Sequence, residues 1–199
     1  MSRFILIRHA AVGPVATRIA GRLPNIELSE AGRQQARKLL GSLAAENIWK
    51  IFSSPRERAY QTAAILAEKN HQQVTIAADL DELDYGQWTG ADLEQLDQNA
   101  RWRAFNSIRS CTRIPGGELI LEVQMRVVGF IDRLHEQSVD GAIVLVTHAD
   151  IIRAALAYYL AMPIDLMLRF DISPASISIL TIHEHGPTVL CVNCTGESQ

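Results

Sequence analysis

The sequence is poor in cysteine, and that scarcity excludes a fold built on disulfide bonds. Its 199 residues include only 3 cysteines, whereas small secreted domains that depend on disulfides are rich in them. No apolar run approaches the roughly 18 consecutive residues that a membrane-spanning helix needs. The first apolar run, residues 4–7, is too short for the core of a signal peptide. We therefore expect a cytoplasmic protein that makes no membrane contact.

An excess of positive charge is also missing. The chain carries 19 Lys and Arg against 22 Asp and Glu, a formal net charge of -3, and only 6% of its residues are aromatic. Proteins that bind nucleic acids usually show a basic excess, and single-strand binders add aromatic residues to it. We therefore expect no nucleic-acid partner. A small anionic substrate remains compatible, because its site needs only a local cluster of cations.

Short apolar runs alternate along the chain with helical patterns. The runs are typical of strands buried on both faces of a parallel sheet, and apolar residues spaced three and four apart indicate the helices. The predicted strands are residues 4–7, 48–52 and 142–146, and the predicted helices follow N-caps at Ser29 and Ser54 and cover 123–134 and 151–156. This alternation predicts an α/β sandwich around a largely parallel sheet.

One segment, residues 80–117, interrupts the alternation. Residues 89–106 look helical and contain tryptophan, and residues 107–117 look like a loop. We therefore expect a single domain over the whole chain, in which 80–117 forms an excursion that packs over the site and selects the substrate. Two further runs, 175–182 and 189–192, flank a His-Glu-His-Gly-Pro turn and predict a terminal hairpin.

Polar and charged residues follow three of the predicted strands. Arg8 and His9 follow the first, residues 53–58 follow the second and open a helix, and Thr147 and His148 follow the third. Ligands of open parallel sheets bind beyond the carboxyl ends of the strands, so these segments deliver cations to one edge. A helix N-terminus there adds free N–H groups and the positive end of the helix dipole.

This set of residues suits a phosphate better than a metal ion. Fixed guanidinium groups oppose a second cation, whereas they bind phosphate oxygens through paired hydrogen bonds. A histidine nitrogen can then serve as a covalent nucleophile, and the leaving alkoxide needs a proton from a nearby acid. Spacing alone does not choose that acid among Asp79, Asp81, Glu82 and Asp84. We expect neither a metal nor a cofactor.

Five motifs stand in the order typical of one enzyme family. They are RHA at 8–10, SPRERAYQTA at 54–63, LDELDYGQWTG at 80–90, PGGE at 115–118 and VTHADIIR at 146–153. The first three resemble the R-H-G, S-P-L-x-R-A-x-Q-T-A and L-x-E-x-x-x-G-x-W-x-G motifs of the histidine phosphatase superfamily, which includes the cofactor-dependent phosphoglycerate mutases. The resemblance runs over nearly the whole chain.

The resemblance implies a fold, an activity and a set of roles. The fold is a three-layer α/β/α sandwich around a mostly parallel sheet, and the activity is a metal-independent phosphohydrolase acting on a small-molecule phosphate ester. His9 is implied as the residue that is phosphorylated, with Arg8, Arg58 and His148 around the phosphoryl oxygens. Glu82 is implied as the proton donor, which later helps water to attack the phosphohistidine.

Three other residues are candidates for contacts to the phosphate or the substrate. Arg22 and Arg18 lie in or beside the loop that follows the first motif, and Thr147 directly precedes His148. Either arginine could meet a phosphate or a carboxylate. The chain also departs from the family pattern, because Ala10 replaces the signature glycine.

Two alternatives to a phosphatase remain open. The glutamate and serine that follow the signature in phosphoglycerate mutases are Ala11 and Val12 here, and the chain lacks the longer basic insertions of those mutases. A non-catalytic phosphate binder would be expected to lose one of the catalytic residues, and none is lost. We therefore predict a phosphatase and keep the mutase and the binder as alternatives. The identity of the ester and the formation of a homodimer stay open.

The C-terminal segment offers a rival site. His183 and His185, together with Cys191 and Cys194, could in principle supply four zinc ligands. On a regular strand, however, residues three apart point to opposite faces, which separates the two cysteines. We therefore interpret these four residues as structural.

Overall fold

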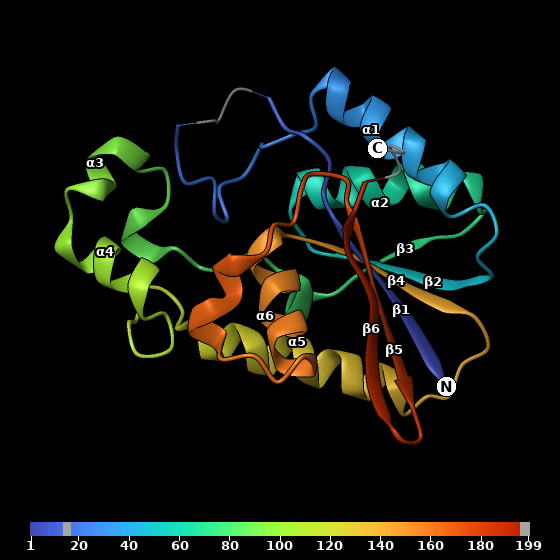
Figure 1. Cartoon of the computed structure of the whole chain (residues 1–199). Helices are drawn as coiled ribbons and strands as arrows, with labels where there is room; N and C mark the ends of the chain where they lie inside the picture. Colours follow the sequence, from blue (N-terminus) through green and yellow to red (C-terminus); the bar gives the residue numbers. More distant parts are fainter. Residues whose placement is uncertain (14–16, 196–199) are drawn as a thin grey trace.

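The computed structural model describes residues 1–13 and 17–195, and a six-stranded sheet runs through its centre (Figure 1). The strands are β1 (Ser2–Arg8), β2 (Ile48–Ser53), β3 (Val74–Ile76), β4 (Ala142–Thr147), β5 (Ile177–His183) and β6 (Gly186–Cys194). Their order is β3-β2-β4-β1-β5-β6. The first four strands in that order are parallel, and β5 and β6 are antiparallel.

Helices cover both faces of the sheet. The helices are α1 (Glu30–Ser42), α2 (Glu57–Lys69), α3 (Leu93–Asp97), α4 (Ala100–Ser107), α5 (Ile120–His135) and α6 (Ala149–Tyr159). Figure 1 shows α1 and α2 over one face, α5 and α6 over the other, and α3 and α4 to one side. The predicted α/β/α sandwich around a mostly parallel sheet is therefore confirmed. None of the helices in the described part of the chain has the length and apolar character needed to cross a bilayer.

The central strands are apolar on both faces because each face meets a layer of helices. In β1, Phe4 and Leu6 belong to the core that also contains α5 and α6. Ile5 and Ile7 belong to the core under α1 and α2. Successive strand residues point to opposite faces, so a strand between two helix layers needs a continuous apolar run. This arrangement explains why the sequence shows unbroken runs here.

One of the two predicted helix starts is correct. The Ser29 hydroxyl accepts a hydrogen bond from the Gly32 amide and caps α1, as predicted. The predicted cap at Ser54 is wrong, because α2 begins at Glu57. The Ser54 amide still donates to the Val146 carbonyl at 2.9 Å, so the chain keeps its pairing with β4 for one residue beyond β2.

The excursion contains two short helices where the sequence predicted one helical stretch over 89–106. Asp92 caps α3, and Asn99 caps α4 through hydrogen bonds from two backbone amides. Each cap is an extended residue that directly precedes a new helix, so the two caps divide the stretch into two helices. The predicted loop at 107–117 is confirmed, since α5 starts at Ile120.

The excursion has its own aromatic packing. Trp88 meets Trp102 with ring centroids 5.3 Å apart and Phe105 at 5.6 Å. All three side chains are buried, so they pack against one another and present no stacking platform. The division of the chain into one domain with a substrate-selecting excursion stays a prediction.

The terminal hairpin is confirmed, but the placement of its cysteines differs from the prediction. The pairing of β5 with β6 shifts between Ile177 and Ile179, and Asn193 adopts a φ of 58° at this bulge. The bulge breaks the alternation of the strand. Cys191 and Cys194 therefore pair with Ile179 and Ile177, two positions on the same side of β5. Burial raises the pKa of Cys191 to about 12, and the neighbouring Cys194 adds to the effect.

Close packing between α1 and the segment after His9 depends on a glycine. A Cβ at Gly32 would collide with the backbone carbonyl of Ala11, whereas a Cβ at Gly41 in the same helix would meet nothing within 4 Å. We expect Gly32→Ala to lower the free energy of unfolding by about 1–3 kcal/mol through overpacking. Gly41→Ala should raise it by up to about 1 kcal/mol through helix propensity.

Urea unfolding of both variants measures this difference. Equal effects of the two substitutions would contradict the account of Gly32, because helix propensity alone would then govern both positions.

Candidate active site

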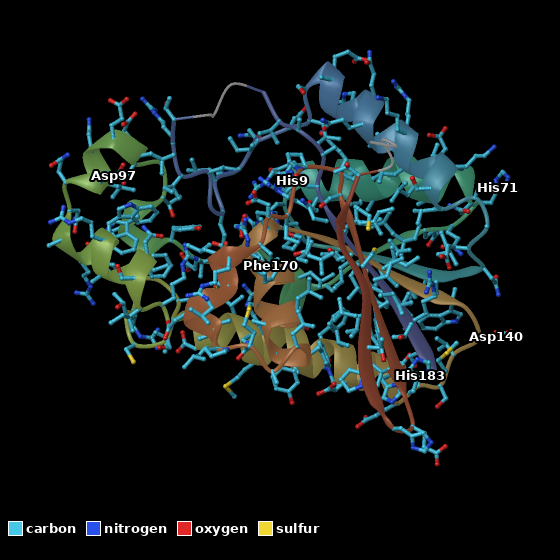
Figure 2. The ribbon with its side chains drawn as sticks, in the orientation of Figure 1. His9, His71, Asp97, Asp140, Phe170 and His183 are labelled. Carbon is cyan, nitrogen blue, oxygen red and sulfur yellow. The ribbon has the colours of Figure 1, made fainter. Side chains whose placement is uncertain are left out.

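The candidate site lies at the carboxyl ends of three adjacent strands. The order β2-β4-β1 places residues 53–54, 147–148 and 8–9 at one edge of the sheet. The His9 amide donates to the Thr147 carbonyl at 2.9 Å, so the strand pairing extends into the site. A cavity of about 480 Å³ opens at this edge, near the position at which Figure 2 marks His9.

Charged groups in the cavity come from separate elements. The lining includes Arg8 at the end of β1, Arg58 in the first turn of α2, Arg18 on the loop after β1, and Glu82 at the start of the excursion. The remaining lining is small or apolar apart from Tyr85 and His9. Three arginines against one carboxyl group make the cavity suitable for an anion.

His9 has a defined tautomer in which Nε2 is unprotonated. Its Nδ1 lies 2.8 Å from the carbonyl oxygen of Ala10. A carbonyl only accepts hydrogen bonds, so Nδ1 carries the proton and Nε2 does not. Nε2 accepts a hydrogen bond from Arg58 Nε at 3.2 Å. Burial lowers the pKa of His9 to about 3, and Arg58 and Arg8 add to the effect. The imidazole is therefore neutral near pH 7, as a nucleophile must be.

Arg8 and Arg58, the two arginines beside His9, each keep an N–H donor that is not used within the described chain. Arg58 is almost fully buried, and its Nη2 donates to the Gly21 carbonyl at 2.8 Å. Arg8 Nη1 donates to the Ile172 carbonyl at 2.5 Å. Within the described chain, Arg58 Nη1 and Arg8 Nε are buried without a hydrogen-bond partner. Such donors are costly to leave unpaired, which indicates that a ligand with acceptor oxygens belongs here.

Glu82 has the properties of an acid that is active near neutral pH. Its Oε2 lies 3.5 Å from Arg58 Nη2 and 3.3 Å from His148 Nδ1. Burial raises the pKa of Glu82 to about 7, and the charge of Asp150 adds to this, although Arg58 opposes it. A carboxyl group with this pKa can donate and accept a proton at physiological pH.

The other three acids of this segment point elsewhere. Asp79 pairs with Arg133 at 3.1 Å, and Asp81 pairs with Arg56 at 2.8 Å. Asp84 accepts from the Gly86 amide at 2.9 Å. Glu82 is thus the member of the segment that lines the cavity.

His148 lies behind the cavity and contacts its charged groups. The ring is fully buried, and Nε2 lies 2.8 Å from the Ser54 hydroxyl. Nδ1 lies 3.3 Å from both Arg58 Nη2 and Glu82 Oε2. Burial lowers the pKa of His148 well below its usual value, and His9 and Arg58 add to the effect. His148 therefore contacts the neighbours of His9 while remaining neutral.

Two predicted binding residues have partners outside the cavity. Arg22 donates through Nε to the Glu82 carbonyl at 2.7 Å and through Nη2 to Glu118 at 2.9 Å. Thr147 donates its hydroxyl to the Leu80 carbonyl at 2.6 Å. Neither residue is among those that line the cavity. Arg22 and Thr147 thus hold the segment that carries Glu82.

Sequence reasoning missed a network beneath the cavity wall. Tyr85 lines the cavity and donates its hydroxyl to Asp150 at 2.8 Å. Arg109, a buried residue of the excursion, pairs with the same carboxylate at 3.2 Å. The one available signal was Asp150 itself, a charged residue in an otherwise apolar helix turn. The network ties the excursion to the first turn of α6, directly after His148.

The rival zinc site is not supported. In residues 1–13 and 17–195, no group of three or more His, Cys, Asp or Glu is arranged to hold a metal ion. His183 instead lies 3.1 Å from the Thr181 hydroxyl. The interpretation of these C-terminal residues as structural stays a prediction.

Comparison with known proteins agrees with this geometry. Phosphoserine phosphatase 1 from Hydrogenobacter thermophilus is 30% identical over 199 residues, spanning 98% of this chain and 93% of that protein. Glucosyl-3-phosphoglycerate phosphatase from Mycolicibacterium vanbaalenii is 32% identical over 176 residues, spanning 82% and 76%. A mutant phosphoserine phosphatase from Entamoeba histolytica, solved with phosphoserine, superposes with a TM-score of 0.88 at 25% identity, over 98% of each chain.

A family profile matches almost the full length of the sequence. The match covers residues 4–195 and belongs to the histidine phosphatase superfamily, branch 1. It includes every segment that contributes a charged group to the cavity. The chain therefore belongs to branch 1 of the histidine phosphatase superfamily.

Proposed function

We propose that the protein hydrolyses a small phosphomonoester through a phosphohistidine formed on His9. The observation that carries the proposal is the unprotonated Nε2 of a neutral His9 beside Arg8 and Arg58, whose buried N–H groups lack partners in the described chain. A phosphate placed against those donors would meet the lone pair of Nε2. The carboxyl group of Glu82 stands on the same cavity.

In the first half-reaction the phosphoryl group moves to the enzyme. The Nε2 lone pair of His9 attacks phosphorus, the N–P bond forms and the P–O bond to the alcohol breaks. Arg8 and Arg58 hold the phosphoryl oxygens and stabilise the charge that develops on them. Protonated Glu82 gives its proton to the leaving oxygen, so the alcohol departs neutral.

In the second half-reaction water takes the place of the alcohol. Glu82, now a carboxylate, accepts a proton from water as its oxygen attacks phosphorus. The N–P bond breaks, and its electron pair returns to Nε2. The products are phosphate and the free alcohol, and Glu82 ends in its initial protonated state.

The relatives support a small metabolite as the substrate. They are named for phosphoserine and for glucosyl-3-phosphoglycerate. We propose an ester of similar size for this chain, because the cavity measures about 480 Å³. We also propose that the protein works in the cytoplasm on free small molecules rather than on nucleic acid, in keeping with its net charge of -3.

Hydrolysis of a phosphomonoester panel in the presence of a chelator tests the proposal. The panel contains an aryl phosphate, O-phosphoserine, 3-phosphoglycerate and sugar phosphates, and both free phosphate and isomerised product are measured. Release of free phosphate is expected. Isomerised phosphoglycerate without free phosphate would instead establish a mutase, and tight binding without turnover would establish a binder.

The pKa of Glu82 predicts the pH dependence. For alkyl phosphates the leaving oxygen needs a proton, so kcat/KM should fall about tenfold per pH unit above the pKa of about 7. His9, with its pKa of about 3, stays neutral over the whole range. Aryl phosphates leave without a proton, so their alkaline limb should be much flatter. Identical alkaline limbs for both classes would contradict the role of Glu82.

A further inference from the structure

The proposed reaction gives no role to one of the three arginines that line the cavity. Arg18 lines the cavity with Arg8 and Arg58, but unlike them it is exposed at the rim. Its guanidinium makes no hydrogen bond or ion pair with any residue of 1–13 or 17–195. A phosphate held by the two inner arginines would leave this third charge uncompensated.

The backbone at Arg18 is fixed to the excursion. The Leu93 amide donates to the Thr17 carbonyl at 2.9 Å, and the Ile19 amide donates to the Ala91 carbonyl at 3.0 Å. Arg18 therefore sits in a short antiparallel bridge opposite Asp92. The Asp92 carboxylate accepts from the Glu94 amide and caps α3, so it serves another purpose. The backbone that carries Arg18 is thus fixed at the cavity mouth.

The neighbouring arginines differ from Arg18 because acidic residues compensate them. Arg56 pairs with Asp81 at 2.8 Å, and Arg22 pairs with Glu118 at 2.9 Å. The described lining that Arg18 shares with the inner arginines includes small and apolar residues such as Ala11, Val12 and Ala20. The wall therefore fits a compact organic group that carries an anion at its far end.

We propose that Arg18 binds a carboxylate on the alcohol part of the substrate, so that the preferred substrates are phosphate esters of small hydroxy acids. The proposal rests on the phosphatase function proposed above. A guanidinium matches a carboxylate through two parallel hydrogen bonds and balances its single charge. A second phosphate would bring up to two charges to a rim that offers one arginine.

Paired ligands separate this inference from the phosphatase function. 3-Phosphoglycerate is compared with glycerol 3-phosphate, and O-phosphoserine with phosphoethanolamine, because each pair differs in the carboxylate. Dissociation constants are measured by calorimetry in a His9→Asn background, which binds without turnover. The same pairs are assayed for kcat/KM with the wild-type nucleophile. Arg18→Gln is the test variant. Arg37→Gln, an exposed arginine of α1 that pairs with Glu30 at 3.7 Å, is the matched control.

We expect the carboxylated ligand of each pair to bind about tenfold more tightly. Arg18→Gln should abolish that preference, and the loss should appear in KM rather than in kcat. Arg37→Gln should retain it. Equal weakening of both members of a pair would overturn the inference, because Arg18 would then bind the phosphate. An unchanged preference in Arg18→Gln would also overturn it. A carboxylate preference in binding without phosphate release would uphold the inference and refute the phosphatase function.

Discussion

Replacing His9 should abolish turnover, with kcat falling on the order of 10³-fold or more, because no other described residue of the cavity lining offers an imidazole nitrogen for the covalent route. Two variants are informative. His9→Ala removes the ring, and His9→Asn keeps an N–H near the position from which Nδ1 donates to the Ala10 carbonyl at 2.8 Å. Both should be inactive towards aryl and alkyl phosphates alike, as measured by phosphate release.

The control for this prediction is His183→Ala. His183 is an exposed residue at the end of β5, far from His9 in Figure 2, and its loss should leave turnover unchanged. Circular dichroism of each variant separates loss of chemistry from loss of fold. Wild-type turnover in a folded His9→Asn protein would refute the nucleophile assignment.

Glu82→Gln should divide substrates by leaving group. For alkyl phosphates kcat/KM should fall by about 10²–10⁴, the usual contribution of general acid catalysis. For aryl phosphates kcat/KM should stay near the wild-type value, since their phosphorylation step needs no proton. Glutamine still offers polar atoms near Arg58 and His148, which lie 3.5 and 3.3 Å from the Glu82 carboxylate.

The same variant should expose the second half-reaction. Without a carboxylate to activate water, the phosphoenzyme formed from an aryl phosphate should accumulate and give a burst of one aryl alcohol per site. Asp79→Asn removes a carboxylate of the same segment that pairs with Arg133 at 3.1 Å, and it should show neither effect. Equal slowing of both substrate classes by Glu82→Gln, with no burst, would transfer the acid role to another group.

The fold was predictable because burial leaves a direct pattern in the sequence. The apolar runs of β1 and β4 reflect helix layers on both faces, and Ser29 is an ordinary cap at the start of α1. The cluster of cations was predictable from the same runs, since parallel strands end at one edge. The start of α2 was not predictable, because the pairing of Ser54 with Val146 of β4 delays the helix.

The details of the site depend on contacts between distant residues. Nothing local distinguishes Glu82 from Asp81, and only the resemblance selected it. Asp81 turns away because Arg56 meets it at 2.8 Å. Arg22 and Thr147 looked like phosphate ligands but bind the carbonyls of Glu82 and Leu80. Such choices follow from the positions of partners that lie 25 to 67 residues away in sequence.

The contact between Cys191 and Cys194 was unpredictable for a local reason. A regular strand would separate the two thiols, and the single left-handed residue Asn193 at the bulge brings them together. The network of Tyr85, Arg109 and Asp150 was hidden for the opposite reason, since its members come from three separate segments.

The most direct test of the account is to trap the phosphoenzyme. Glu82→Gln is mixed with an aryl phosphate and quenched within the burst, and the site of phosphorylation is located by mass spectrometry under conditions that preserve phosphohistidine. We expect close to one phosphoryl group per chain, on Nε2 of His9, and none in the double variant with His9→Asn. Phosphate release without any phosphoenzyme, or a phosphoryl group on another residue, would contradict it.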